Sequence, residues 1–207
     1  MQFAEPITTE AELRAITGLP APRALNKELT KLDVHCRAII AKSSFVLISS
    51  SDKDGRVDAS PKGDPPGFVQ VLDDVTLAIP DRPGNRRADT FRNVLQNPRV
   101  GLLFLVPGRS ETLRVNGRAL IVRDRPLRER MTVQGKLPEL ALVVSAEEVF
   151  VHCPKCMLRS RLWVREAWPD VTDLPSHARC LVDHAGLAQP VEEVEATVRE
   201  GIRNTLY

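Results

Sequence analysis

Short apolar runs separated by turn signals dominate the middle of the chain. They predict strands over residues 43–50, 57–62, 68–72, 75–79, 100–106, 111–122 and 142–151. Asp54-Gly55 and Asp73-Asp74 lie between neighbouring runs and are typical of hairpin turns. Short strands joined by hairpins predict an antiparallel barrel rather than alternating strand–helix units.

Helical spacing of apolar residues appears at both ends of the chain and at a few places inside it. It predicts helices over residues 8–17, 26–41, 86–95, 126–133, 175–188 and 191–207. In the second of these, His35 and Cys36 are interpreted as packing residues. We therefore predict an α+β protein that is mainly β. Its N-terminal helices (1–42) pack on the barrel (43–168), and a helical tail (169–207) follows.

The segment between the fourth and fifth predicted strands has an unusual charge pattern. Pro83-Gly84 is a turn signal, and Asn85 is a good N-cap for the helix that follows. Arg86 and Arg87 then fall in the first helical turn, where each cation opposes the helix dipole by about 0.3–1 kcal/mol. A bound phosphate would explain this pattern. The alternative is that Asp81 or Asp89 pairs with the arginines on the surface.

Two predicted strands carry polar residues on one face. Alternation places Asp58, Ser60 and Lys62 together on the first, and Thr112, Arg114 and Asn116 together on the second. These faces could line a site next to the helix start. The alternative is that both simply face solvent, as one side of an antiparallel sheet commonly does.

In combination, these segments resemble the pyridoxamine 5′-phosphate oxidase-like family of FMN-binding split barrels. The helix start resembles the family's phosphate-binding Ser-Arg-Lys motif, and residues 112–117 resemble its Gln-Val-Arg-Val-x-Gly strand. The matches Ser-Pro-Lys-Gly-Asp-x-Pro-Gly-Phe, Pro-Asp-Arg-x-Gly-Asn and His-Cys-x-Lys resemble an uncharacterised bacterial branch of that family. The resemblance extends from about Leu25 to Trp168.

The resemblance implies an antiparallel split barrel that binds FMN, acts on a small molecule as an oxidoreductase, and forms a homodimer with the flavin at the interface. Arg86 and Arg87 would hold the phosphate. Lys62 or Arg114 would lie near the N1 and O2 edge of the ring, and Lys155 and Arg159 would reach the flavin of the other subunit. The implied cofactor-binding residues are Asp58, Ala59, Ser60, Lys62, Pro80, Asp81, Asn85, Arg86, Arg87, Thr112, Arg114, Lys155, Arg159 and Ser160. No catalytic acid–base pair stands out.

Other functions stay open at this stage. Arg161-Leu162-Trp163 stands where the true oxidase has an Arg-x-His motif, so the resemblance does not extend to its substrate. A deazaflavin could replace FMN, and the protein could bind flavin without turnover. Residues 82–130 hold twelve arginines against four acidic residues, a local charge of +8 against −6 for the rest. A nucleic-acid partner is nevertheless disfavoured, because the stretch offers no aromatic stacking platform.

The cysteines and the chain's hydrophobicity limit other possibilities. His152-Cys153-Pro154-Lys155-Cys156 contains three candidate metal ligands, one His and two Cys, but a structural zinc site needs a fourth ligand, so we expect no metal. Trp163, further along this segment, could cover a ring edge or anchor the helix. We expect no signal peptide and no membrane span, and therefore a reducing cytoplasm.

Overall fold

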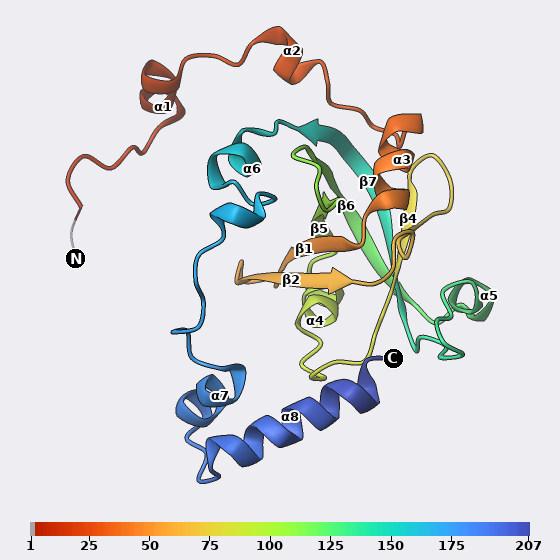
Figure 1. Cartoon of the computed structure of the whole chain (residues 1–207). Coiled ribbons are helices and arrows are strands. Elements are labelled where there is room, and N and C mark those ends of the chain that lie inside the picture. Colours follow the sequence, from red (N-terminus) through yellow and green to blue (C-terminus); the bar gives the residue numbers. More distant parts are fainter. Residues whose placement is uncertain (1–2) are drawn as a thin grey trace.

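The computed structural model describes residues 3–207 and contains a seven-stranded antiparallel sheet that curls into an open barrel (Figure 1). The strands are β1 (Phe45–Ser51), β2 (Val57–Gly63), β3 (Gln70–Val71), β4 (Thr76–Pro80), β5 (Arg99–Leu105), β6 (Thr112–Val122) and β7 (Ala141–His152). Their order across the sheet is β2-β1-β5-β6-β7-β4-β3. The predicted α+β class and antiparallel split barrel are confirmed.

The helices lie mostly at the two ends of the chain. They are α1 (Glu10–Thr17), α2 (Pro22–Leu25), α3 (Val34–Lys42), α4 (Asp89–Gln96), α5 (Arg125–Glu129), α6 (Lys155–Ser160), α7 (His177–Ala185) and α8 (Val191–Thr205), with a 3₁₀ turn at Arg165–Ala167. None of the described helices is long and apolar enough to cross a bilayer. Only α4 is inserted between the strands of the barrel's first half, as the sequence predicts.

The strand register explains which side chains form the core. Residues directly opposite each other on neighbouring strands point to the same face of a sheet. One such row joins Ser60, Ile48, Leu102, Val115 and Val149, and its four apolar members are almost completely buried. This row therefore marks the interior of the barrel, with Ser60 at its open end on β2.

The predicted helix over residues 26–41 is wrong in its first half. The backbone of Leu29 instead exchanges two hydrogen bonds with Val149, which extends the sheet beyond the end of β4. The helix proper starts after Asp33, whose carboxylate accepts a hydrogen bond from the Cys36 backbone. Cys36 is buried as expected, but His35 is exposed, because adjacent helical residues cannot both face the core.

The two ends of the chain relate differently to the barrel. Among the N-terminal elements α3 places residues in the core, whereas α1 and α2 bury no side chain and lie away from the barrel in Figure 1. At the other end, α7 and α8 pack on each other, and α8 crosses below the barrel mouth. The domain boundaries drawn from the sequence stay a prediction.

Candidate functional site

The polar face of β2 points toward the open end of the barrel. Asp58, Ser60 and Lys62 pair across the strand with residues of β1 that are buried, so these three side chains share the inner face. Val57 alternates with them and is 85% exposed, as expected for the outer face. The predicted alternation along β2 is thus confirmed, and its polar side is the one that faces inward.

The loop between β4 and α4 has a different shape from the one predicted. The helix starts at Asp89, so Asn85 is not its N-cap, and Arg86 and Arg87 precede the helix. Arg86 and Ala88 adopt left-handed φ angles of 60° and 55°, which interrupt a helical backbone. The Asn85 side chain instead accepts a hydrogen bond from the Arg87 backbone at 3.0 Å, closing a local turn.

Arg86 and Arg87, the two adjacent arginines of this loop, differ in their partners. Arg87 Nε donates to Asp89 Oδ2 at 2.7 Å, so the surface pairing considered as an alternative is present for this residue. Arg86 has no ion pair within residues 3–207. Left-handed conformations in residues other than glycine cost of order 1 kcal/mol or more and tend to gather at ligand sites. Of this adjacent pair, Arg87 is therefore fixed by Asp89, whereas Arg86 has no ion-pair partner among residues 3–207.

A cleft of about 710 Å³ lies between β2 and this loop, where the sheet fails to close. Buried apolar residues of β1, β4 and β7, namely Ile48, Ile79 and Leu142, form its inner wall. The cleft brings together nine of the residues predicted to bind a cofactor: Asp58, Ala59, Ser60, Lys62, Pro80, Asp81, Asn85, Arg86 and Arg87. Segments that are distant in the sequence thus form the walls of one cleft.

Burial alters the acid–base behaviour of one group in this cleft. Asp81 follows Pro80 at the end of β4, and burial raises the pKa of its carboxyl, although Lys62 and Arg82 act in the opposite direction. Burial disfavours the charged form of a carboxyl, which explains the sign. The two cations show that this part of the cleft carries positive charge close to the apolar wall.

Several residues of the cleft were not predicted from the sequence. Thr90 is only 5% exposed, and its hydroxyl is buried without a hydrogen-bond partner among the described residues. Arg82 and Thr205 also line the cleft, the latter from α8. The predicted helix start at Asn85 concealed Thr90, because it placed this hydroxyl inside the helix rather than in its first turn.

Buried polar atoms normally find a partner, so an exception in a cleft points to a missing ligand. One carboxylate oxygen of Asp58 is in the same condition as the hydroxyl of Thr90: buried and unpartnered in the part of the chain that the structure covers. Both residues line the cleft, from β2 and from the first turn of α4 respectively. A ligand with both acceptor and donor groups would satisfy them.

The polar face of β6 lies elsewhere. Its neighbours Leu113 and Val115 are fully buried, so Thr112 and Arg114 point to the outer face of the sheet. The Arg114 guanidinium lies 5.2 Å from the centroid of the Phe150 ring. The expectation that the polar faces of β2 and β6 line one site is therefore wrong within a single chain, because they lie on opposite sides of the sheet.

The α6 segment is also outside the cleft. Lys155, Arg159 and Ser160 are exposed, and the Ser160 hydroxyl donates to the backbone oxygen of Met157. Trp163, just after α6, donates its ring N–H to the backbone oxygen of Arg109 at 2.8 Å, which is the anchoring role of the two considered. Among residues 3–207, no three His, Cys, Asp or Glu side chains cluster as metal ligands would.

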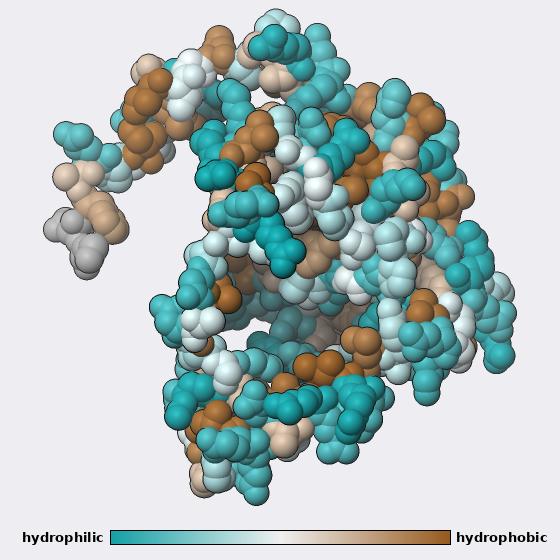
Figure 2. All heavy atoms as spheres, in the orientation of Figure 1, coloured by the Kyte–Doolittle hydropathy of each residue, from teal (hydrophilic) through white to brown (hydrophobic). Residues whose placement is uncertain are grey.

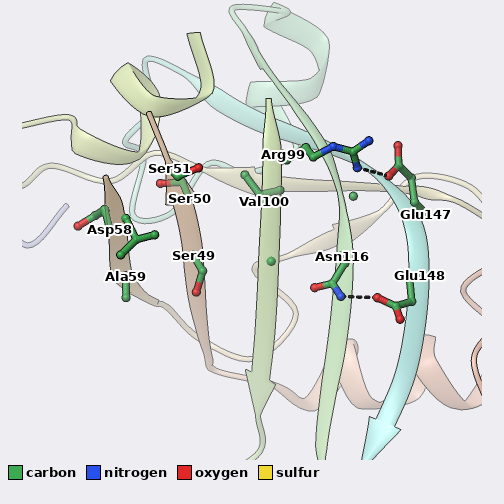
Figure 3. Close-up of a pocket in the computed structure, with 13 residues that line it drawn as sticks. Ser49, Ser50, Ser51, Asp58, Ala59, Arg99, Val100, Asn116, Glu147 and Glu148 are labelled. Atoms are coloured by element: carbon green, nitrogen blue, oxygen red, sulfur yellow. Dashed lines mark hydrogen bonds and ion pairs between the residues drawn. The ribbon is translucent and has the colours of Figure 1, made fainter. Parts of the chain in front are cut away.

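A second hollow of about 720 Å³ lies on the outer face of the sheet (Figure 3). Arg99 pairs with Glu147 at 3.0 Å, and Asn116 donates to Glu148. A β-bulge between Asn116 and Gly117 leaves Glu147 without a directly opposite residue on β6. Of the predicted cofactor-binding residues only Asp58 and Ala59 reach this hollow, so the cleft at the barrel mouth is the better candidate.

The chain matches one protein-family model and is similar to several solved structures. A family model described as "Pyridoxamine 5′-phosphate oxidase" matches residues 32–153. A putative pyridoxamine 5′-phosphate oxidase from Lactobacillus delbrueckii is 23% identical and covers 60% of this chain and 98% of its own, with a TM-score of 0.47. HupZ from Group A Streptococcus (17%, 58% and 99%, TM-score 0.48) and an FMN-binding protein from Syntrophomonas wolfei (13%, 59% and 91%, TM-score 0.45) are also similar. No curated protein matches the chain.

Proposed function

The chain belongs to the pyridoxamine 5′-phosphate oxidase family, and we propose that it is an FMN-dependent oxidoreductase that acts on a small molecule. The cleft at the barrel mouth would hold the flavin. One observation carries the proposal: the cleft gathers the family-like segments of β2, β4 and the loop before α4 around two buried polar groups that have no hydrogen-bond partner among residues 3–207. These groups and the loop's cations fit the chemistry of a phosphate-bearing, hydroxyl-rich cofactor.

The phosphate end of the flavin would lie at the loop and the start of α4. Arg86 and Arg87 supply positive charge there, and the Thr90 hydroxyl can donate a hydrogen bond to a phosphate oxygen. The first-turn backbone N–H groups of α4 add to this, since a helix N-terminus favours an anion. Asp89, which already pairs with Arg87, would keep that arginine oriented.

The β2 residues would contact the rest of the cofactor. The unpartnered carboxylate oxygen of Asp58 can accept a hydrogen bond from a ribityl hydroxyl, and Ser60 can donate or accept one. Lys62 holds a positive charge on the same wall, which favours negative charge on a neighbouring ring. The flavin itself would supply the transfer of hydride or electrons. Arg114 does not line this cleft, so Lys62 is the candidate for this charge.

The purified protein should be yellow, or should take up FMN and give flavin absorption bands. The physical reason is the fit of the cleft to the cofactor, and the measurement is an absorption spectrum followed by an FMN titration. Bleaching by a reduced nicotinamide nucleotide, with colour returning in air, would support turnover; binding without such a cycle would favour a flavin-binding protein that has no reaction of its own. A colourless protein that fails to bind FMN in the titration would refute the proposal.

We also propose that the protein is a homodimer whose second copy covers the outer face of the sheet. That face exposes Val57 and Phe45, and it carries Arg114 beside Phe150. Leu47 and Leu103 lie beside Phe45 on this face and are also partly exposed, and an apolar group of this kind is typical of a protein interface. The exposed cations of α6 could then reach the flavin of the partner. The four cysteines of the chain are free thiols, which persist in a reducing compartment, so we propose that this dimer is cytoplasmic.

Chains that lack different halves of a shared site should restore FMN binding when mixed. One chain carries Arg86→Ala, and the other carries Lys155→Ala with Arg159→Ala; each should bind FMN poorly alone. In heterodimers one of the two sites contains only native residues, so titration after subunit exchange should recover part of the binding. If exchange is confirmed by mass and no binding returns, each site is built within one chain.

A further inference from the structure

The C-terminal helix α8 ends beside the loop to which we assign the phosphate. Thr205 lines the same cleft as Asn85, Arg86 and Arg87. Figure 1 shows the loop between β4 and α4 running down to the C-terminal end of α8. Figure 2 shows a hollow between the C-terminal helices and the barrel, with apolar surface along the helix that borders it. The helix therefore bounds the phosphate end of the cleft.

Tyr207 fastens this end of the helix to the barrel. Its hydroxyl donates to Asp64 Oδ1 at 2.7 Å, and the other oxygen of Asp64 accepts from Arg82 Nε at 2.6 Å. The Arg82 guanidinium also lies 5.7 Å from the centroid of the Tyr207 ring. The Asp64 side chain is 1% exposed, and charge-assisted bonds to such a carboxylate are strong. We call Tyr207, Asp64 and Arg82 the clasp.

The clasp is connected to the phosphate loop through Arg82. This residue lines the cleft, and it lies at the start of the segment that contains Asn85 and the two arginines. Its Nη2 atom also donates to the backbone oxygen of Met131 at 2.9 Å, which fixes the guanidinium from a second side. The end of α8 and the beginning of the loop are thus held to one buried carboxylate.

We propose that the clasp makes the site selective for a flavin that ends in a phosphate monoester. This inference rests on the proposed function, because it takes the cleft to be the flavin site. FMN ends at its phosphate, next to Arg86 and Arg87. In flavin adenine dinucleotide the phosphate continues into a second nucleotide, which would have to pass Thr205 and Tyr207. A deazaflavin with a tail beyond its phosphate would meet the same obstacle.

Titration of the full-length protein with FMN, flavin adenine dinucleotide and riboflavin tests this selectivity. The wild-type protein should bind FMN at least about ten times more tightly than the dinucleotide. Tyr207→Ala loses the hydrogen bond to Asp64 and the ring contact with Arg82, so the ratio of the two Kd values should fall by about tenfold. Tyr207→Phe should give a smaller fall, since it keeps the ring. Leu206→Ala, at an exposed neighbouring position, should leave the ratio unchanged.

Riboflavin separates selectivity from a general loosening of the site. It has no phosphate, so its Kd should not change in the Tyr207 variants, whereas loss of fold would weaken all three ligands together. A Kd ratio that stays at the wild-type value in Tyr207→Ala overturns the inference while leaving the flavin site intact. A wild-type protein that binds the dinucleotide as tightly as FMN also overturns it. If the wild-type protein binds none of the three, the proposed function fails and the clasp inference fails with it.

Discussion

Replacing Arg86 with alanine should weaken FMN binding about ten- to a hundredfold and leave riboflavin binding nearly unchanged. A lost charge-assisted hydrogen bond costs about 1.5–3 kcal/mol, which gives this range of affinity, and riboflavin lacks the phosphate that makes the bond. Arg87→Ala should act in the same direction. Its effect should be smaller, since Arg87 already shares its guanidinium with Asp89. Fluorescence titration with both ligands measures the difference.

Arg92→Ala is the matched control for this experiment. Arg92 is an exposed arginine of α4, it lies 3.8 Å from Asp89, and it does not line the cleft. Its removal takes away one positive charge near the helix start, but the side chain that is removed does not itself line the cleft. Equal losses of FMN and riboflavin affinity in Arg86→Ala would mean that the arginine supports the fold of the loop rather than a phosphate.

Gly117→Ala should destabilise the protein by about 3 kcal/mol, with a fall in Tm on the order of 6–12 °C. Gly117 lies at the β-bulge between β6 and β7, where a Cβ atom would be 2.0 Å from the backbone oxygen of Ser145. A backbone atom cannot rotate away as a side chain can, so the two strands of the barrel would have to separate locally. Thermal unfolding followed by circular dichroism measures the change.

Gly101→Ala provides a comparison on the neighbouring strand β5. A Cβ at Gly101 would approach the Asn116 side chain at 3.2 Å, and this side chain can shift by a few tenths of an ångström. The loss of stability should therefore be well below that of Gly117→Ala. If the two variants unfold at the same temperature, the close approach of β6 and β7 at the bulge does not constrain residue 117 as the geometry requires.

Local sequence patterns were sufficient to predict most of the strands and helices. The alternation along residues 57–62 predicts β2 and its two faces, because successive side chains of a strand point to opposite faces. The apolar run at 100–106 predicts β5, a strand of the core. The capping pair Thr9 and Glu12 predicts α1, and both of its hydrogen bonds are present. These features depend on neighbours in the chain, so the sequence is sufficient to find them.

Where the local predictions failed, interactions outside the local pattern determined the backbone structure. Leu29 has helical spacing with Leu32, but the free edge of β7 takes its backbone instead. Asn85 is a residue type favoured at an N-cap, but the left-handed conformations of Arg86 and Ala88 prevent the helix from starting before Asp89. In both places a contact or turn outside the local pattern competes with a helix that propensity alone favours only weakly.

In the candidate site, the kinds of side chain follow from local patterns in the sequence, whereas their assembly into one cleft depends on how the sheet and the helices pack. The residues of β2, β4 and the arginine loop could be proposed from their types and spacing. The register of strand pairing determines that β6 turns its polar face outward, since the rows through Ser60 and through Arg114 lie on opposite sides of one curved sheet. Thr90, Thr205 and Tyr207 join the cleft or its border only because the sheet leaves its mouth open and α8 crosses it. Such contacts cannot be predicted from a local sequence pattern, since they depend on how distant segments pack.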